Sequence, residues 1–320
     1  MGEKRNAIVD SPESEKVCVL LQIPLPRLVQ QLEGRFHLLR MEDLDSSTSS
    51  RVWGLVSTNY SPVDRSLLEF LPNLQIICNC AVGVEHIDLD LCGGRGIGVT
   101  NGAHSQVTAD TADMAILLML ASIRRVCSAH KFMQSGSWSL NSFPLARKAS
   151  GVRVGIVGLG QIGRAIAKRA VGFNSIVSYF GPTKKEDVSY AYYSGVVDLA
   201  ANSNVLIIAC LLSKDTRHMI GKDVFDALGP TGTLINVARG AVVDELELTK
   251  ALVAKRLGAA GLDVFEKEPY VCGELMSMEN VVLSPHAGSG TWETRTAVVQ
   301  LVVDNLNAFF TGKPLLSAVI

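Results

Sequence analysis

In the second half of the sequence, chemically reactive residue types follow segments with the composition of buried strands. Arg239 follows an apolar strand at 234–237, Asp263 and Glu268 lie in and after the next strand at 261–264, and His286 follows a third. In an open parallel α/β sheet, ligands bind at the carboxyl ends of the strands, so we expect these groups to converge. A guanidinium binds carboxylates through paired hydrogen bonds, and an imidazole exchanges protons near neutral pH. Taken singly, a strand-end His or Arg is often only structural.

A glycine-rich loop earlier in the chain predicts a dinucleotide site. It has the pattern GxGxxG and consists of Gly158, Leu159, Gly160, Gln161, Ile162 and Gly163. A strand is expected before it at 153–157 and a helix after it at 164–170. The first glycine makes the tight turn, the second lets the backbone approach a pyrophosphate, and the third lets the helix pack on the strand. The helix N-terminus then offers N–H groups to the phosphates. The alternative is a glycine-rich turn of structural value only.

The end of the next expected strand, 176–180, bears on which dinucleotide binds. It is followed by Gly181, Pro182, Thr183, Lys184 and Lys185. An NAD-specific site carries an acidic residue at this strand end, where it binds the ribose 2′-hydroxyl, and none is present. The hydroxyl and the two ammonium groups suit a 2′-phosphate, which favours NADP(H) and leaves NAD(H) possible. The alternative is that both lysines belong to a solvated loop.

The elements that must position these residues form two series of short apolar segments, each alternating with longer amphipathic ones. This alternation is typical of parallel sheets with helical crossovers. Strands are expected at 17–22, 52–57, 74–80 and 97–100, and again at 153–157, 176–180, 205–211, 233–237, 261–264 and 281–283. The sequence therefore predicts an α/β fold with two doubly wound parallel-sheet domains, the second inserted into the first.

Two long helices and an irregular arm complete the expected elements. Residues 108–134 contain neither Gly nor Pro and have helical periodicity. They predict one continuous helix of ~40 Å, long enough to cross a domain boundary. An irregular arm is expected at 138–147 and a final amphipathic helix at 294–310.

Composition excludes several classes of protein. Of the 320 residues, 48% are hydrophobic, which excludes intrinsic disorder. Thirty Lys and Arg against 31 Asp and Glu show no basic excess of the kind that a nucleic-acid surface carries. No apolar segment approaches the roughly 20 residues of a membrane helix, and the seven cysteines lack zinc-ligand spacing, so neither a membrane span nor a metal site is expected. The first six residues lead into no apolar leader region, so a cytoplasmic location is expected.

Several motifs together resemble those of the D-isomer-specific 2-hydroxyacid dehydrogenases. They are VGVEHID at 82–88, GLGQIG at 158–163, LINVARGAVVD at 234–244, GLDVFEKEP at 261–269 and SPHAG at 284–288. Within this family the chain is most similar to the plant hydroxyphenylpyruvate reductases and to the glyoxylate/hydroxypyruvate reductases. Residues 178–185 and the sequence GKPLL at 312–316 carry that closer resemblance.

The resemblance implies a role for each matching residue. Arg239 would bind the substrate carboxylate and polarise the ketone, His286 would be the catalytic acid and base, and Glu268 would be its paired acid. Asp263 would face the nicotinamide carboxamide. The backbone amides of Val82 and Gly83 would bind the other oxygen of the substrate carboxylate, and the side chains of Arg239 and His286 would also contact the substrate.

The resemblance also implies an organisation and an activity. Residues 1–103 and 289–320 would form a flavodoxin-like substrate domain, and residues 104–288 the dinucleotide-binding domain. The expected activity is the reduction of hydroxypyruvate, glyoxylate or 4-hydroxyphenylpyruvate to the D-2-hydroxy acid. The expected assembly is a homodimer formed through the cofactor domain, with the arm around Trp138 reaching across.

One departure from the family and one competing function remain open. Many relatives have a Thr-Pro pair after the Asn at the domain crossing, where this chain has Asn101, Gly102, Ala103, His104 and Ser105. We interpret His104 as a hinge or surface residue rather than a second catalytic histidine. The competing function is that of a dinucleotide-sensing regulatory protein, because transcriptional corepressors share the architecture and the triad.

Overall fold

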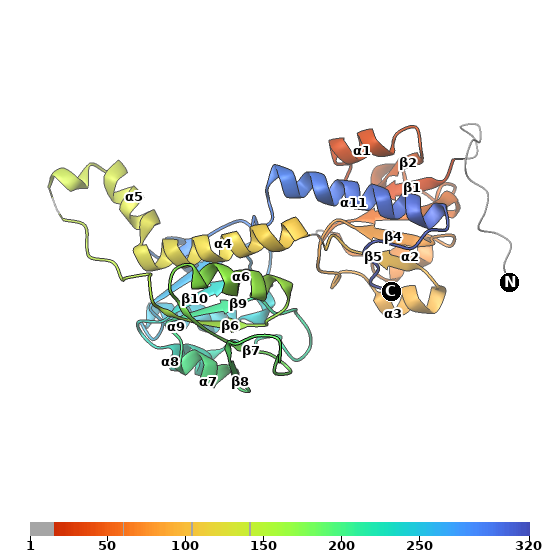
Figure 1. Ribbon diagram of the computed structural model, residues 1–320. Coiled ribbons are helices and arrows are strands. Elements are labelled where there is room, and N and C mark those ends of the chain that lie inside the picture. Colours follow the sequence, from red (N-terminus) through yellow and green to blue (C-terminus); the bar gives the residue numbers. More distant parts are fainter. Residues whose placement is uncertain (1–15, 60, 104, 141) are drawn as a thin grey trace. The chain divides into compact units, whose positions relative to one another are not determined.

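The computed structural model describes residues 16–59, 61–103, 105–140 and 142–320 (Figure 1). The chain divides into two compact units. Unit 1 contains the chain up to Val107 together with Thr291–Ile320, and unit 2 is Thr108–Gly290. The unit boundaries thus fall a few residues after those expected at 103 and 288. His104 and the N-terminal residues used to predict the location lie outside the described residues.

Unit 1 is built on a five-stranded parallel sheet. Its strands are β1 (Cys18–Leu21), β2 (His37–Arg40), β3 (Val52–Ser57), β4 (Ile76–Asn79) and β5 (Gly98–Thr100). Their order in the sheet is β2-β1-β3-β4-β5, which is the flavodoxin-like order. Apolar side chains of α1 (Pro26–Leu32) and α11 (Trp292–Phe310) pack on one face. Those of α2 (Arg65–Phe70) and α3 (Leu89–Arg95) pack on the other.

Unit 2 has a seven-stranded parallel sheet. Its strands are β6 (Arg153–Val157), β7 (Ile176–Phe180), β8 (Ala191–Tyr193), β9 (Val205–Ile208), β10 (Thr233–Asn236), β11 (Ala259–Leu262) and β12 (Val281–Leu283). The order is β12-β11-β10-β9-β6-β7-β8. Successive strands are therefore added on one side of β6 up to β8 and on its other side from β9 onward, so the strand order reverses between β6 and β9. This is the doubly wound dinucleotide-binding order with one added strand. The predicted fold class is confirmed.

Helices cover both faces of the second sheet. On one face, α4 (Ser105–Arg124) and α6 (Gln161–Val171) bury their apolar sides against β6, β9 and β10. On the other face lie α7 (Val196–Ala201), α8 (Lys222–Leu228) and α9 (Glu245–Val253). The short α10 (Gly273–Ser277) precedes β12. Short 3-10 turns occur at Met41–Asp43, Ser49–Arg51, Ser137–Ser139 and Gly240–Val242.

The prediction of one continuous helix over 108–134 was wrong. The structure has two helices, α4 and α5 (Val126–Gln134), separated by Arg125 in a left-handed conformation with φ of 52°. The Arg125 guanidinium lies 5.3 Å from the centre of the Phe143 ring and 3.4 Å from the Glu279 carboxylate. Because a left-handed residue cannot continue a right-handed helix, the chain bends here.

By length and composition, α4 is the one helix among the described residues that could cross a membrane. Ala112, Ala115 and Met119 on α4 are fully buried within the core of unit 2. Such packing is how an apolar core helix of a globular domain is accommodated.

Candidate active site

The first and last glycines of the GxGxxG loop sit where a side chain cannot fit. Gly158 has a φ of +95°, and a Cβ there would lie 2.7 Å from the Cα of Cys210. A Cβ on Gly163 would lie 2.1 Å from the Gly158 carbonyl oxygen. Cys210 comes shortly after β9 and Gly158 directly after β6, so the loop lies at the point where the strand order reverses. This is where doubly wound sheets bind their ligands.

The same loop has the features of a pyrophosphate site. A Cβ on Gly160 would meet no protein atom within 4 Å, so the backbone faces open space here. Gly160 is also the N-cap of α6, which leaves the N–H groups of the first turn, from Gln161, Ile162 and Gly163, without a side-chain cap. These N–H groups and the helix dipole attract anions. The residues present therefore fit a dinucleotide.

The loop that follows β7 is held by two tyrosine hydroxyls. The Tyr192 hydroxyl donates to the Gly181 carbonyl at 3.2 Å, and the Lys185 N–H donates to the Tyr179 hydroxyl at 2.7 Å. The two rings pack with their centres 5.4 Å apart. Between these two attachments, Pro182, Thr183 and Lys184 are exposed. The loop is thus fixed at both ends, and its polar groups face solvent.

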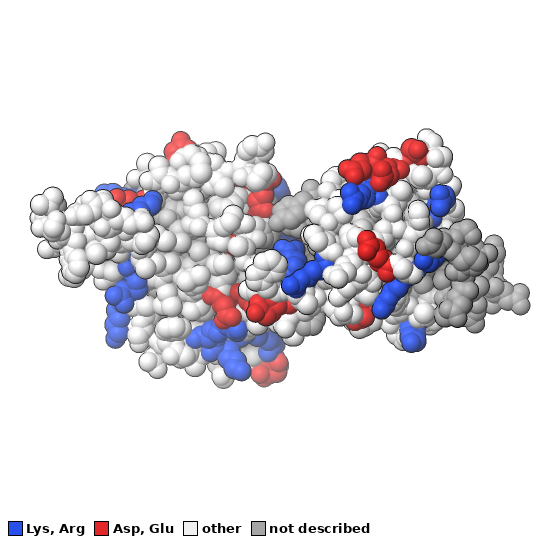
Figure 2. Space-filling view, turned by 90° about the horizontal axis from the view of Figure 1, so that it is seen from above, with Lys and Arg blue, Asp and Glu red and all other residues white. Residues whose placement is uncertain are grey.

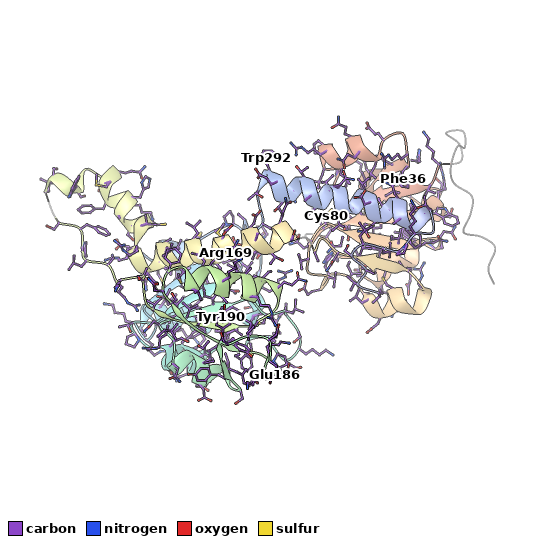
Figure 3. The ribbon with its side chains drawn as sticks, viewed as in Figure 1. Phe36, Cys80, Arg169, Glu186, Tyr190 and Trp292 are labelled. Atoms are coloured by element: carbon purple, nitrogen blue, oxygen red, sulfur yellow. The ribbon has the colours of Figure 1, made fainter. Side chains whose placement is uncertain are left out.

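Two acidic residues follow this loop, and one of them is neutralised. Asp187 forms an ion pair with Arg164 of α6 at 2.8 Å, and this hydrogen-bonded contact lowers the pKa of Asp187. Glu186 is exposed and is labelled in Figure 3. Arg169, also labelled there, ties α6 to α4 through a 2.6 Å contact with Asp113. The helix that begins at the phosphate loop is therefore anchored along its length.

Glu268 and His286 form a hydrogen-bonded pair. The distance between His286 Nδ1 and Glu268 Oε2 is 2.7 Å, and Glu268 Oε1 accepts the Phe265 N–H at 3.0 Å. Burial alone would raise the pKa of Glu268. The hydrogen bonds from His286 and Phe265, with the charges of His286 and Arg239, outweigh burial and lower it. An ionised carboxylate only accepts hydrogen bonds, so Nδ1 carries a proton and Nε2 is left for a substrate.

Arg239 lies beside the same site, because its neighbour Gly240 is in close backbone contact with Phe265, and its charge helps to lower the pKa of Glu268. The turn that carries it is shaped by the buried Asn236 at the end of β10. The Asn236 amide donates to the Arg239 carbonyl at 3.0 Å, and its side-chain oxygen accepts the Ala238 N–H at 3.0 Å. Arg239 Nη1 donates to the Ala238 carbonyl at 2.7 Å. Asn236 is therefore a site-shaping residue that the sequence reasoning missed.

Asp263 supports the histidine through backbone contacts. It is buried, and its two carboxylate oxygens accept the N–H groups of Ala287 and Gly288, each at 2.8 Å. The His286 N–H donates to the Asp263 carbonyl at 2.7 Å. Asp263 therefore holds the loop that carries His286, and the contact with a cofactor expected from the sequence stays a prediction.

Val82 and Gly83 belong to unit 1, in the loop that follows β4. The buried Asn79 donates to the carbonyls of Ala81 at 2.9 Å and Gly83 at 2.8 Å, and Asn101 donates to that of Val82 at 3.0 Å. These contacts fix the peptide planes whose N–H groups were expected to bind substrate. Asn79 and Asn101 are two further residues whose role the sequence did not indicate.

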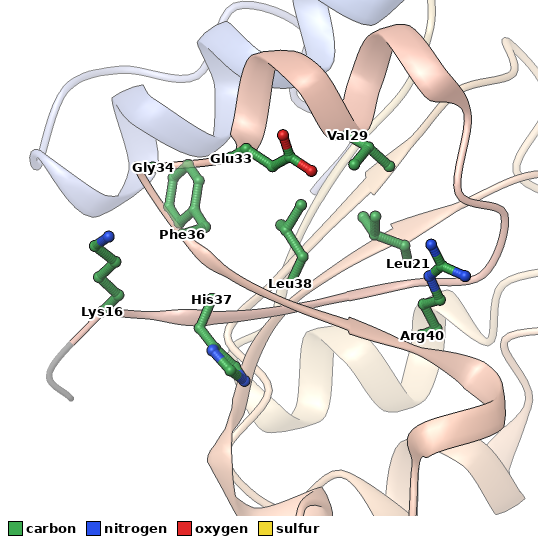
Figure 4. Close-up of a pocket in the computed structure, with 9 residues that line it drawn as sticks. All are labelled: Lys16, Leu21, Val29, Glu33, Gly34, Phe36, His37, Leu38 and Arg40. Carbon is green, nitrogen blue, oxygen red and sulfur yellow. The ribbon is translucent and has the colours of Figure 1, made fainter. Parts of the chain in front are cut away.

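The site does not coincide with the cavity drawn in Figure 4. That cavity, of about 400 Å³, lies in unit 1 and is lined by residues of α1, β1 and β2 and the chain around them. Leu21, Val29 and Leu38 form apolar walls, and Lys16 and Arg40 contribute positive charge. None of the predicted site residues lines it.

Comparison with known proteins agrees with the class that the fold and site define, a nicotinamide dinucleotide-dependent oxidoreductase. The NAD-binding domain of the D-isomer-specific 2-hydroxyacid dehydrogenases matches residues 116–288. A hydroxyphenylpyruvate reductase of Plectranthus scutellarioides is 46% identical over 313 residues, covering 96% of this chain and all of that protein. A glyoxylate/hydroxypyruvate reductase of Arabidopsis thaliana is 47% identical with the same coverage.

Solved structures lead to the same assignment. An NADPH-dependent glyoxylate/hydroxypyruvate reductase from Sinorhizobium meliloti, in complex with NADP and malonate, has a TM-score of 0.90 and 35% identity. The match covers 95% of this chain and 97% of that one. The chain belongs to the D-isomer-specific 2-hydroxyacid dehydrogenase family. It is an oxidoreductase that binds a nicotinamide dinucleotide.

Proposed function

We propose that this protein reduces a small 2-keto acid to the D-2-hydroxy acid, with NADPH as its preferred cofactor. The observation that carries the proposal is the Glu268–His286 pair with the charge of Arg239 acting on it. The activities named for the relatives support it, since these are reductases of hydroxyphenylpyruvate, hydroxypyruvate and glyoxylate. The substrate class follows from the residues: a cation for a carboxylate and an acid for a forming alkoxide.

The residues of the chain have distinct tasks in this reaction. Arg239 binds the substrate carboxylate in a paired geometry and orients the ketone. His286 donates the proton at Nε2 to the ketone oxygen, while Glu268 stabilises the imidazolium. The 158–163 loop would hold the dinucleotide, which would supply the hydride when bound.

A turnover assay tests this proposal against the regulatory alternative. The assay measures kcat/KM for glyoxylate, hydroxypyruvate and 4-hydroxyphenylpyruvate, each with NADPH and with NADH. Turnover of any of them with D stereochemistry supports the enzyme. Tight dinucleotide binding without turnover of any 2-keto acid would instead favour a sensor of the same fold.

We expect kcat/KM with NADPH to be at least severalfold higher than with NADH. No acid at the end of β7 repels a 2′-phosphate, Thr183 and Lys184 are exposed beside it, and Asp187 is already paired with Arg164. Placing an acid there, Gly181→Asp, should reverse the preference, because a carboxylate binds a 2′-hydroxyl and repels a phosphate. Gly181→Ala is the matched control, since a Cβ there meets no atom within 4 Å. Equal or better use of NADH by the unaltered protein contradicts this expectation.

Glu268→Gln should move the pH dependence of turnover. The amide keeps the shape, but its single oxygen can accept only one of the two hydrogen bonds that Glu268 accepts, and it lacks the charge that favours imidazolium. Reduction requires the imidazolium, so its rate should decline at a lower pH than in the unaltered protein. Oxidation of the hydroxy acid requires neutral imidazole, so its working range should extend to lower pH. The measurement is kcat/KM against pH in both reaction directions for both proteins. If the profiles of the variant are unchanged, Glu268 does not tune His286.

The assembly and location also belong to this proposal. The arm carries strongly exposed apolar side chains at Trp138, Leu140 and Leu145, which suit contact with a second copy in a homodimer. Sedimentation should give a dimer, and Leu145→Glu with Trp138→Glu should weaken it.

Lys and Arg are intermixed with Asp and Glu on the face shown in Figure 2, which suits a cytoplasmic enzyme acting on small molecules rather than on nucleic acid or membranes.

A further inference from the structure

The catalytic loop, residues 265–268, carries Glu268 and a second acidic residue, Glu266. The partners of Glu266 have no task in the proposed reaction. Glu266 precedes Glu268 by two residues, and its Oε1 lies 2.9 Å from Arg217 Nη2 and 2.8 Å from His218 Nε2. The Glu266 N–H donates to Glu245 Oε2, at the start of α9, at 3.0 Å. The side chain is only 21% exposed. Arg217 and His218, from one turn, and Glu245, at the start of α9, therefore hold Glu266 in place.

The turn that holds Glu266 is also attached to the segment that follows Arg239. The His218 N–H donates to the Ala241 carbonyl at 2.9 Å, and the Ile220 N–H donates to that of Val242 at 3.1 Å. His218 is in a left-handed conformation with φ of 52°, which lets one residue bond both segments. Its backbone binds the Arg239 segment, and its ring binds the Glu268 loop.

The segment that follows Arg239 and the loop at 265–268 are in direct backbone contact. A Cβ on Gly240 would lie 1.9 Å from the Phe265 carbonyl carbon, so only glycine allows the approach. Phe265 is also the residue whose N–H binds Glu268 Oε1. A shift of the loop at 265–268 would therefore move Glu268 relative to both Arg239 and His286.

We propose that Glu266 is a positioning residue for this reaction: its contacts with His218, Arg217 and Glu245 keep Glu268 in register with His286 and Arg239. The inference rests on the proposed function. An isolated exposed ion pair contributes little to stability. Glu266 instead joins two segments that both carry reacting groups, so its effect should appear in the chemistry. Small misplacements of reacting groups cost rate even far from the bond that changes.

The test compares Glu266→Ala with a matched variant, Glu247→Ala. Glu247 on α9 has a side chain 19% exposed and also binds an arginine, Arg256, at 2.6 Å, while its other oxygen pairs with Lys250 of the same helix. We expect Glu266→Ala to lower kcat/KM for the keto acid about tenfold, with unchanged dinucleotide Kd. The pH at which reduction declines should fall, because the Glu268–His286 pair is loosened. Glu247→Ala should change only the midpoint of thermal unfolding.

A conservative variant keeps the test decisive if Glu266→Ala does not fold. Glu266→Gln retains an oxygen that accepts from His218 and Arg217, so it should recover most of the lost kcat/KM and of the pH shift. If Glu266→Ala and Glu266→Gln behave like Glu247→Ala, with altered unfolding but an unaltered pH profile, Glu266 is only structural and the proposal is overturned. Absence of turnover in the unaltered protein would instead contradict the proposed function.

Discussion

Replacing Arg239 with Lys is expected to lower kcat/KM for the 2-keto acid by a factor of about 30 to 900, with dinucleotide Kd near normal. The range corresponds to about 2–4 kcal/mol for loss of an electrostatic contact that is strongest in the transition state. Lysine keeps the positive charge but presents a single ammonium instead of the planar fork that pairs with a carboxylate. The ketone would then lose orientation as well as binding.

The measurement is a pair of titrations on the same protein. Steady-state kinetics with varied keto acid report the substrate contact, and fluorescence titration with NADPH reports the cofactor site. Lys250→Arg on α9, which pairs with Glu247 at 3.6 Å, is a control for exchange of these two cations elsewhere in unit 2. If NADPH binding collapses in Arg239→Lys while the control binds normally, Arg239 belongs to the cofactor site or to the fold.

The central strands could be predicted from the sequence because each is a buried apolar segment. The expected ranges at 52–57, 153–157 and 176–180 coincide with the inner strands β3, β6 and β7, and the range at 281–283 coincides with the apolar edge strand β12. The two strands that were missed, β2 and β8, lie at the edges of their sheets and are partly exposed. An edge strand with polar residues lacks the apolar run that marks a central parallel strand.

The break between α4 and α5 could not be predicted for a different reason. Helix ends are recognised by Gly, Pro and capping residues, and Arg125 is none of these. Its left-handed conformation accompanies contacts with Phe143 and with Glu279, far away in the sequence. Tertiary contacts of this kind override local helix propensity.

The contact between Glu268 and His286 could be predicted from the sequence, but the groups that hold these two residues could not. Glu268 and His286 were expected to pair, and they do so at 2.7 Å. The sequence GLDVFEKEP contains acids of one type at Glu266 and Glu268, and only the structure shows that their partners differ. Asn236 and Asp263 likewise act through hydrogen bonds to backbone groups, and such bonds leave no residue pattern to recognise.

The largest loss of rate is expected from His286→Gln. General acid catalysis contributes about 10²- to 10⁴-fold, and glutamine can bind the ketone oxygen without delivering a titratable proton. The rate of keto-acid reduction should therefore fall by about that factor, and the remaining activity should lose the pH dependence that Glu268 imposes. Dinucleotide binding should persist, because the 158–163 loop is held by contacts that do not involve His286. Retained turnover with an unchanged pH profile would mean that another group supplies the proton.

The double variant Glu268→Gln, His286→Gln separates this role from a second one. If Glu268 acts on the reaction only through His286, adding Glu268→Gln to His286→Gln should reduce kcat/KM no further, because residues that act as a unit are not additive. An additional loss in the double variant would show that Glu268 also acts elsewhere, and Arg239, whose charge reaches the same carboxylate, is the group through which it would do so. Arg239→Lys in the His286→Gln background then tests that connection directly.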